Sequence, residues 1–240
     1  ESYNKIFYDG ESHMNATMAV VILKDLVNEL EVATRNKGFE KYSEKLIHIS
    51  QSMELLRQKV LKAFMADLGD RKFSKRMYFA GKFYGEENMF LEPQGFLLQM
   101  NELPVERKKV LYKEMQERVY KNEKIGARQQ ESPQFDDEEF EKGSRENGGI
   151  WWALNGPVIL GVAQYDKEEA NRLLKNLTFD NFIKNFPDYW TSYWSQADNF
   201  ESSIMPGEGL ADQSADYPDS PVFCAHAHAW PLYCYFRIQD

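Results

Sequence analysis

The strongest constraint on the fold is a regular spacing of apolar residues across residues 42–68. They recur every three or four positions, as Tyr42, Leu46, Ile49, Met53, Leu56, Val60, Phe64 and Leu68. This spacing places all of them on one face of an α-helix. A second apolar stretch covers residues 14–36, and Gly38 is a natural stop for it. We therefore expect two long helices joined by a short connector, which is an αα-hairpin.

The remaining sequence alternates between helical patterns and loops of unequal length. Pro93 and Pro104 each suit the first turn of a helix. Gly156-Pro157 is expected to kink or start an apolar helix that follows Gly148, and Thr178 can cap a later one. Further helices are expected at residues 167–176 and, as a buried last helix, at 225–238. The sequence therefore predicts an all-α fold built from helix pairs.

The segments between these helices differ in character. Residues 73–91 are aromatic around two glycines and predict a loop with minor short strands. Residues 129–146 are polar and acidic, which indicates a surface loop. Residues 188–222 are rich in proline and glycine and predict a long ordered loop.

Composition excludes several classes of function. The net charge of −9 disfavours binding to nucleic acid, which requires a basic surface. No apolar run approaches the roughly 20 residues that span a membrane. Cys224 and Cys234 form neither a disulfide framework nor a zinc motif, so a reducing, cytoplasmic location is expected. The four histidines form no metal motif, and we expect no metal or cofactor.

Four short clusters combine polar groups with nearby aromatic residues at loop–helix junctions. They are Asp9-Gly10-Glu11-Ser12, Glu92-Pro93-Gln94-Gly95, Arg145-Glu146-Asn147-Gly148-Gly149 before Trp151 and Trp152, and Cys224-Ala225-His226-Ala227-His228-Ala229-Trp230. Sugars are bound by this combination, because polar side chains take the hydroxyls and aromatic faces cover the apolar C–H surface.

Each cluster also has a simpler structural explanation. Asp9 and Glu92 can stabilise the start of a helix by charge–dipole attraction. The pair Arg145-Glu146 can be a surface ion pair that contributes little stability. His226 and His228 are two positions apart, so on a helix they face different ways. The tryptophans can belong to the core. These residues alone predict a helical protein and leave its function open.

Taken in order, the clusters resemble a known family. GESHMNATMAVVIL from Gly10, FLEPQG ending at Gly95, SRENGGI at residues 144–150 and CAHAHAWPLYCY near the end are similar to segments of the cellobiose-phosphorylase family of inverting glycoside phosphorylases. The last segment resembles the branch that acts on β-1,2-linked oligoglucans. The resemblance implies an (α/α)₆ barrel, of which residues 1–240 would be the C-terminal portion of the catalytic domain.

The same resemblance implies a reaction and a set of roles. The family phosphorolyses β-linked gluco-oligosaccharides to α-glucose 1-phosphate with inversion, using inorganic phosphate as co-substrate. Substrate binding would fall to Glu92, Gln94, Glu146, Trp151 and Trp152. Glu146 would hold hydroxyls of the donor glucose, and Glu92 and Gln94 would shape the same pocket or support the residues that touch the sugar. The general acid would be an aspartate upstream of Glu1, since Asp9 sits at the wrong point of the pattern. Because this chain departs from the family at the last helix, we hypothesise that a cation-capable imidazole at His226 or His228 takes over the contact with phosphate.

Two departures from the family pattern leave alternatives open. Many members carry a phosphate-binding histidine near the position of Ala153, and a Thr-Gly-Thr run stands where this chain has Ala225-His226-Ala227. A glycoside hydrolase on the same barrel would fit the missing histidine, and a non-catalytic sugar-binding helical module would fit the lack of a visible general acid. We also expect apolar helix faces that pack against the rest of the same enzyme or a companion chain, and a homodimer is compatible with the sequence.

Overall fold

The computed structural model describes residues 10–134, 141–189, 198–205 and 225–239. These are mostly helical, with one small antiparallel sheet. The sheet has the order β1-β2-β3, formed by Gly10–Ser12, Met77–Phe79 and Lys82–Tyr84. Gly10 pairs with Phe79, and Met77 pairs with Tyr84. The predicted all-α class is thus confirmed at the coarse level, with the short strands in the expected aromatic segment.

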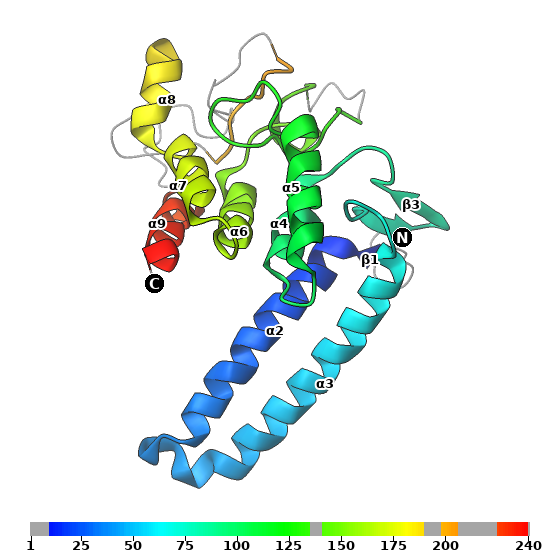
Figure 1. Ribbon diagram of the computed structural model, residues 1–240, viewed down its shortest axis with the longest axis vertical. Helices are drawn as coiled ribbons and strands as arrows, with labels where there is room; N and C mark the ends of the chain where they lie inside the picture. The colour runs from blue at the N-terminus through cyan, green and yellow to red at the C-terminus, as the bar shows by residue number, and fades with distance from the viewer. Residues whose placement is uncertain (1–9, 135–140, 190–197, 206–224, 240) are drawn as a thin grey trace.

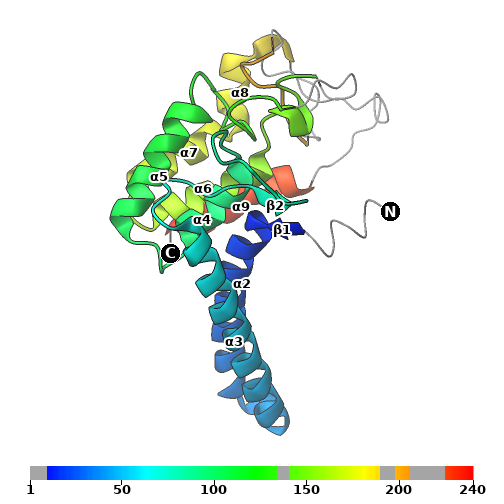
Figure 2. The ribbon, with the colours of Figure 1, turned by 90° about the vertical axis from the view of Figure 1, so that its right-hand side faces the viewer.

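The predicted hairpin is present as helix α2 (His13–Thr34) and helix α3 (Ser43–Leu68), joined by the 3₁₀ helix η1 (Lys37–Tyr42). Ser12 caps α2, because its Oγ accepts a hydrogen bond from the Asn15 N–H at 3.2 Å. The two helices pack against each other along their length and extend as an arm away from the other elements (Figure 1, Figure 2).

Shorter helices make up the body of the molecule. They are α4 (Leu91–Gln99), α5 (Val105–Arg118), α6 (Trp152–Ala163), α7 (Lys167–Asn176), α8 (Phe179–Asn185) and α9 (Ala225–Gln239), with 3₁₀ turns η2 (Arg145–Asn147) and η3 (Pro187–Tyr189). The predicted helix starts at Pro93, Pro104 and Thr178 are confirmed within two residues. Pro157 lies inside α6, which begins at Trp152, so it does not start the helix.

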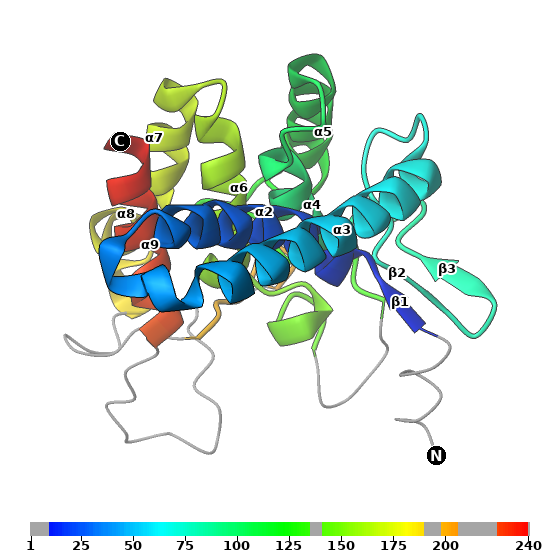
Figure 3. The same cartoon turned by 90° about the horizontal axis from the view of Figure 1, so that it is seen from below.

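Helices α2, α4, α6 and α9 pack one against the next in series. Seen from below, α9, α6 and α4 follow one another across the molecule (Figure 3). Glycines allow the close approach: a Cβ on Gly95 would lie 2.8 Å from Pro157, and one on Gly161 would lie 2.3 Å from Leu98. The contact nearer the start of α4, at Gly95, is also the one nearer the start of α6, at Pro157. The contact between Leu98 and Gly161 lies further along both helices, so α4 and α6 run parallel.

Helices α9 and α2 run in the same direction as α4 and α6. Gly156 near the start of α6 contacts Trp230 near the start of α9, and the ends of both helices, at Gln164 and Arg237, line one hollow. His13 at the start of α2 is hydrogen-bonded to Ser74, which is also bonded to Gln94 at the start of α4. All four helices therefore begin at one end of the molecule.

Two expectations require correction. The last helix was expected to be buried, yet the side chains of Leu232, Tyr233, Tyr235 and Phe236 are exposed, and Cys234 and Ile238 are the buried pair. The expected surface loop at 129–146 begins with buried residues, because Gln129 and Gln130 are 5% and 0% exposed. Among the described helices, none has both the length and the apolar character that a membrane span requires.

Candidate functional site

Four extended segments meet where α4 and α6 begin. Isolated bridges join Phe90 to Gln130, Arg128 to Ile150 and Ile150 to Phe200. We call these paired segments the layer. Gln129 lies between two of them: its N–H donates to the Gly149 carbonyl at 2.8 Å, and its carbonyl accepts from the Leu91 N–H at 2.7 Å. The clusters around Glu92 and Gly149, far apart in the sequence, thus lie side by side.

Glu92 is buried in the first turn of α4, with 9% of its surface exposed. Its carboxylate pairs with Arg76, whose Nη2 donates to Oε1 at 3.1 Å, and it accepts a second hydrogen bond from Gln129 Nε2 at 3.0 Å. Oε2 has a single long contact, with Arg76 Nε at 3.4 Å. A buried carboxylate needs such partners, and this one retains capacity to accept a further hydrogen bond.

Gln94 does not face a ligand in this structure. It is fully buried, its Nε2 donates to the carbonyls of Ser74 and Phe90, both at 2.8 Å, and its Oε1 accepts from the Ser74 N–H at 3.0 Å. The amide is satisfied by the backbone of the loop that also carries Arg76. In this structure Gln94 therefore supports the loop behind Glu92, which agrees with the supporting role that was one of its two expected roles.

The segment Arg145–Gly149 is a tight turn. Gly143 and Gly148 adopt positive φ angles of 92° and 110°, which are accessible chiefly to glycine. A Cβ on Gly149 would lie 2.6 Å from the Arg145 backbone nitrogen, so only glycine fits there. The Glu146 side chain at the centre of this turn is exposed. The carboxylate of Glu146 is thus accessible to a ligand, on a turn that requires glycines.

The two tryptophans have different environments. Trp151 is half-buried, and its Nε1 donates to the Arg145 carbonyl at 3.1 Å. Trp152 is 1% exposed, its Nε1 donates to the Ile125 carbonyl at 2.9 Å, and its ring packs on Phe200 with centroids 5.2 Å apart. Trp152 therefore belongs to the core and does not offer a face to a sugar, whereas Trp151 retains an accessible part.

Gln129 and Gln130 belong to this site, although the sequence did not single them out. While Gln129 donates to Glu92, Gln130 Nε2 donates to Asn147 Oδ1 at 3.2 Å, next to Glu146. Two consecutive glutamines therefore link the extended segments to the segment of Glu92 and to the segment of Glu146. Their signal in the sequence is weak, because two glutamines in a polar stretch are typical of a surface loop.

Arg128 holds this glutamine pair in place. Its guanidinium donates to backbone carbonyls of Arg118, Lys121, Gln130 and Glu131. It also forms an ion pair with Glu123 at 2.8 Å, whose side chain is fully buried and accepts from Ser203. Such a multiply bonded arginine fixes the turn that precedes the glutamines.

The remaining predicted residues are placed only in part. His226 and His228 lie in the first turn of α9, and their side chains are outside the described residues. Asp9 and Cys224 also lie outside them, and Glu11 is exposed at β1. In the described part of the chain, no three His, Cys, Asp or Glu residues form a group suited to a metal ion.

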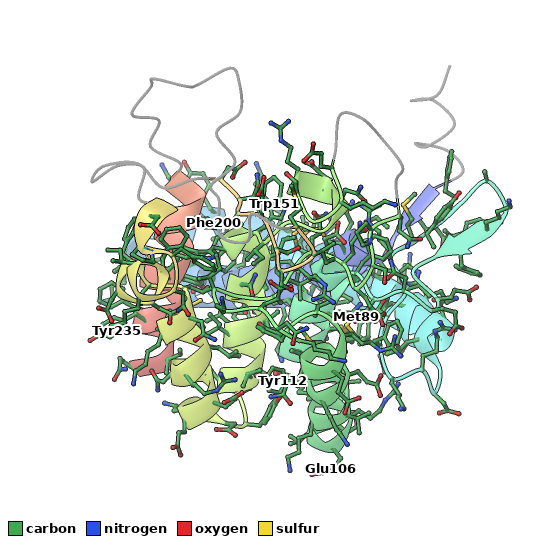
Figure 4. The ribbon with its side chains drawn as sticks, turned by 90° about the horizontal axis from the view of Figure 1, so that it is seen from above. Met89, Glu106, Tyr112, Trp151, Phe200 and Tyr235 are labelled. Carbon is green, nitrogen blue, oxygen red and sulfur yellow. The ribbon has the colours of Figure 1, made fainter. Side chains whose placement is uncertain are left out.

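A separate hollow of about 250 Å³ lies at the opposite end of the parallel helices, lined by residues that include Lys24, Asp25, Glu102 and Arg237. The hollow is lined by both acidic and basic side chains. It lies at the C-terminal ends of α4 and α6, whose free carbonyl groups repel anions such as phosphate. Figure 4 shows Trp151 and Phe200 together on one side of the molecule, with Glu106 and Tyr112 on the other. We therefore place the candidate site at the end where the helices begin.

No protein-family model matches the chain, and no curated protein matches it at a significant level.

Proposed function

We propose that this chain is the sugar-binding part of a glycoside phosphorylase, which cleaves β-linked gluco-oligosaccharides with phosphate to α-glucose 1-phosphate. The observation that carries the proposal is the layer that joins the buried Glu92 to the exposed Glu146 turn at the start of α4 and α6. Carboxylates accept sugar hydroxyls, and the half-buried Trp151 supplies an aromatic surface beside them.

The arrangement of helices supports the same proposal. In an (α/α)₆ barrel, α2, α4, α6 and α9 would belong to the inner ring, and α3, α5 and α7 would return the chain on the outside. The N-terminal ends of helices carry positive partial charge and free N–H groups, which attract an anion such as phosphate. Substrate and phosphate would then meet at the end where Glu92 and Glu146 lie.

The inverting reaction assigns binding, and not proton transfer, to these residues. A general acid must protonate the glycosidic oxygen while phosphate attacks the anomeric carbon from the opposite face. By the resemblance, a separate aspartate would be this acid. Glu92 and Glu146 would hold the hydroxyls of the donor glucose, so that the anomeric carbon stays in line with phosphate.

The test uses the full-length protein that contains this chain, incubated with β-1,2- and β-1,4-linked glucose disaccharides with and without phosphate. We expect α-glucose 1-phosphate, formed only when phosphate is present. Glu146→Gln should lower kcat/KM by about 10- to 100-fold, since a hydrogen bond to a charged group contributes roughly 1.5–3 kcal/mol. Glu106→Gln is the matched control and should change nothing, because this carboxylate on α5 is largely exposed and pairs only with the exposed Lys109.

A hydrolase on the same scaffold is the second candidate, favoured by Ala153. This alanine lies in the first turn of α6, at the place where the resembled family carries a phosphate-binding histidine. Release of free glucose at equal rates with and without phosphate would support the hydrolase. Sugar binding without any turnover would instead indicate a non-catalytic module and would contradict both enzymes.

A further inference from the structure

Gln129 has one polar atom that the protein leaves without a partner. The residue is 5% exposed, and its backbone N–H and carbonyl are both hydrogen-bonded. Its Nε2 donates to Glu92 Oε1 at 3.0 Å. Its Oε1 is buried and forms no hydrogen bond with any residue in the part of the chain that the structure describes. A buried carbonyl oxygen without a donor costs about 1–3 kcal/mol, so a missing donor is the natural explanation.

The atoms around Gln129 define the kind of donor that would fit. Glu92 Oε2, with only its 3.4 Å contact to Arg76, is a second acceptor with spare capacity on the neighbouring residue. Arg76 already neutralises the charge of Glu92. The pair therefore offers two acceptors at a site without excess charge, which suits two neutral hydroxyl groups better than a cation.

We propose that Gln129 is a sugar-binding residue of this site. Its Oε1 accepts one hydroxyl proton, while its Nε2 holds Glu92 so that the carboxylate accepts an adjacent hydroxyl. The ligand class is a pyranose with hydroxyls on neighbouring carbons. This inference rests on the proposed function, because it takes the ligand of the site to be a sugar.

Two substitutions separate the roles of the amide. Gln129→Leu keeps the volume and removes both hydrogen bonds, and Gln129→Glu keeps the acceptor and replaces the donor. Titration of a β-1,2-linked glucose disaccharide into the full-length protein, followed by calorimetry, should show about tenfold or greater loss of affinity in Gln129→Leu. Tenfold corresponds to about 1.4 kcal/mol.

Gln129→Glu should bind weakly at pH 8 and regain affinity as the pH falls toward 5. A protonated carboxyl can donate to Glu92 as the amide did, whereas an ionised one repels it. Misfolding would not produce this recovery. Gln58→Leu is the control, since it removes an amide–carboxylate hydrogen bond of the same kind, to Glu54 at 2.6 Å, on the exposed arm.

The outcomes distinguish this inference from the proposed function. If the unmodified protein binds no sugar, the proposed function fails and this inference fails with it. If it binds sugar and Gln129→Leu binds equally well, the proposed function stands and the inference alone is overturned. Equal affinity is also the result expected if a fixed water molecule occupied Gln129 Oε1.

Discussion

His13, the first residue of α2, is enclosed by groups of different charge. Its Nδ1 lies 3.0 Å from Ser74 Oγ, and its Nε2 lies 3.4 Å from Asp67 Oδ2. Lys75 pairs with the other oxygen of Asp67 at 2.7 Å, and the ring meets Phe64 edge to face. Burial lowers the pKa of His13 below 6.5, and this effect outweighs the opposing attraction of Asp67. The site loop that carries Arg76 directly follows Ser74 and Lys75.

This environment predicts a stability that depends on pH through His13. The pKa is lower in the folded state, so the unfolded chain binds the proton more readily as the pH falls. The contribution of a neutral His13 is complete above about pH 6.5 and is lost below it, down to the folded pKa. Glu11 and Asp67 moderate the change, and Arg71 and Lys75 strengthen it.

Urea unfolding at pH 5 and pH 7.5 measures this contribution. The unmodified protein should lose more free energy of unfolding between the two pH values than His13→Asn, by at most about 1.4 kcal/mol for each pH unit. His48→Asn on exposed α3 is the control and should follow the unmodified protein. Equal pH dependence in His13→Asn and the unmodified protein would contradict the assignment.

At the scale of elements, glycines decide how closely the parallel helices pack. A Cβ at Gly161 would lie 2.3 Å from Leu98 Cβ, and both residues are enclosed between α4 and α6. Gly161→Ala forces these helices apart, although alanine is the better helix former. We expect a loss of about 1–3 kcal/mol in the free energy of unfolding, as for other overpacked cores.

Chemical denaturation of Gly161→Ala beside Gly38→Ala measures this effect. Gly38 lies in the exposed η1 turn, and a Cβ there would meet only Asn36 Oδ1 at 3.3 Å, an ordinary side-chain atom that can shift slightly. The control should therefore change stability by less than about 0.5 kcal/mol. If Gly161→Ala is as stable as the control, the prediction is wrong, and α4 and α6 are not packed as closely as the structure indicates.

The elements themselves could be predicted wherever local chemistry determined them. The period of α3, the cap at Thr178 and the proline before α5 depend only on neighbouring residues. The exposure of α9 could not be predicted, because an aromatic helix has the same pattern whether or not a neighbour covers it. The burial of Gln129 has a similar cause, since distant segments enclose it.

At the scale of the whole molecule, the candidate site depends on contacts that no local pattern encodes. Glu92 and Glu146 were predicted as separate polar clusters, and the resemblance alone placed them in one pocket. The structure brings their segments together through backbone hydrogen bonds of Gln129 to Leu91 and Gly149. Trp152 is buried, whereas Trp151 is half-buried. This difference could not be predicted from two adjacent tryptophans in the sequence.

Many large apolar side chains on the helices remain exposed to solvent. Large apolar side chains remain exposed along both helices of the arm and on α9, namely Ile22, Leu26, Val32, Ile47, Leu55, Leu56, Leu232, Tyr233, Tyr235 and Phe236. Extended apolar surface of this kind usually marks an interface. The expectation that the chain packs against another part of the same protein, or against another chain, therefore remains a prediction.

Sedimentation of the 240-residue chain produced by itself tests that prediction. We expect the mean mass to rise with concentration, because burying Leu55 and Phe236, each 59% exposed, removes apolar surface from water. Leu55→Glu and Phe236→Glu should each shift the distribution toward the monomer. Neither residue supports the core, so the free energy of unfolding should change little. Lys62→Glu, a charge change on exposed α3, is the control, and a chain that stays monomeric at every concentration would contradict the prediction.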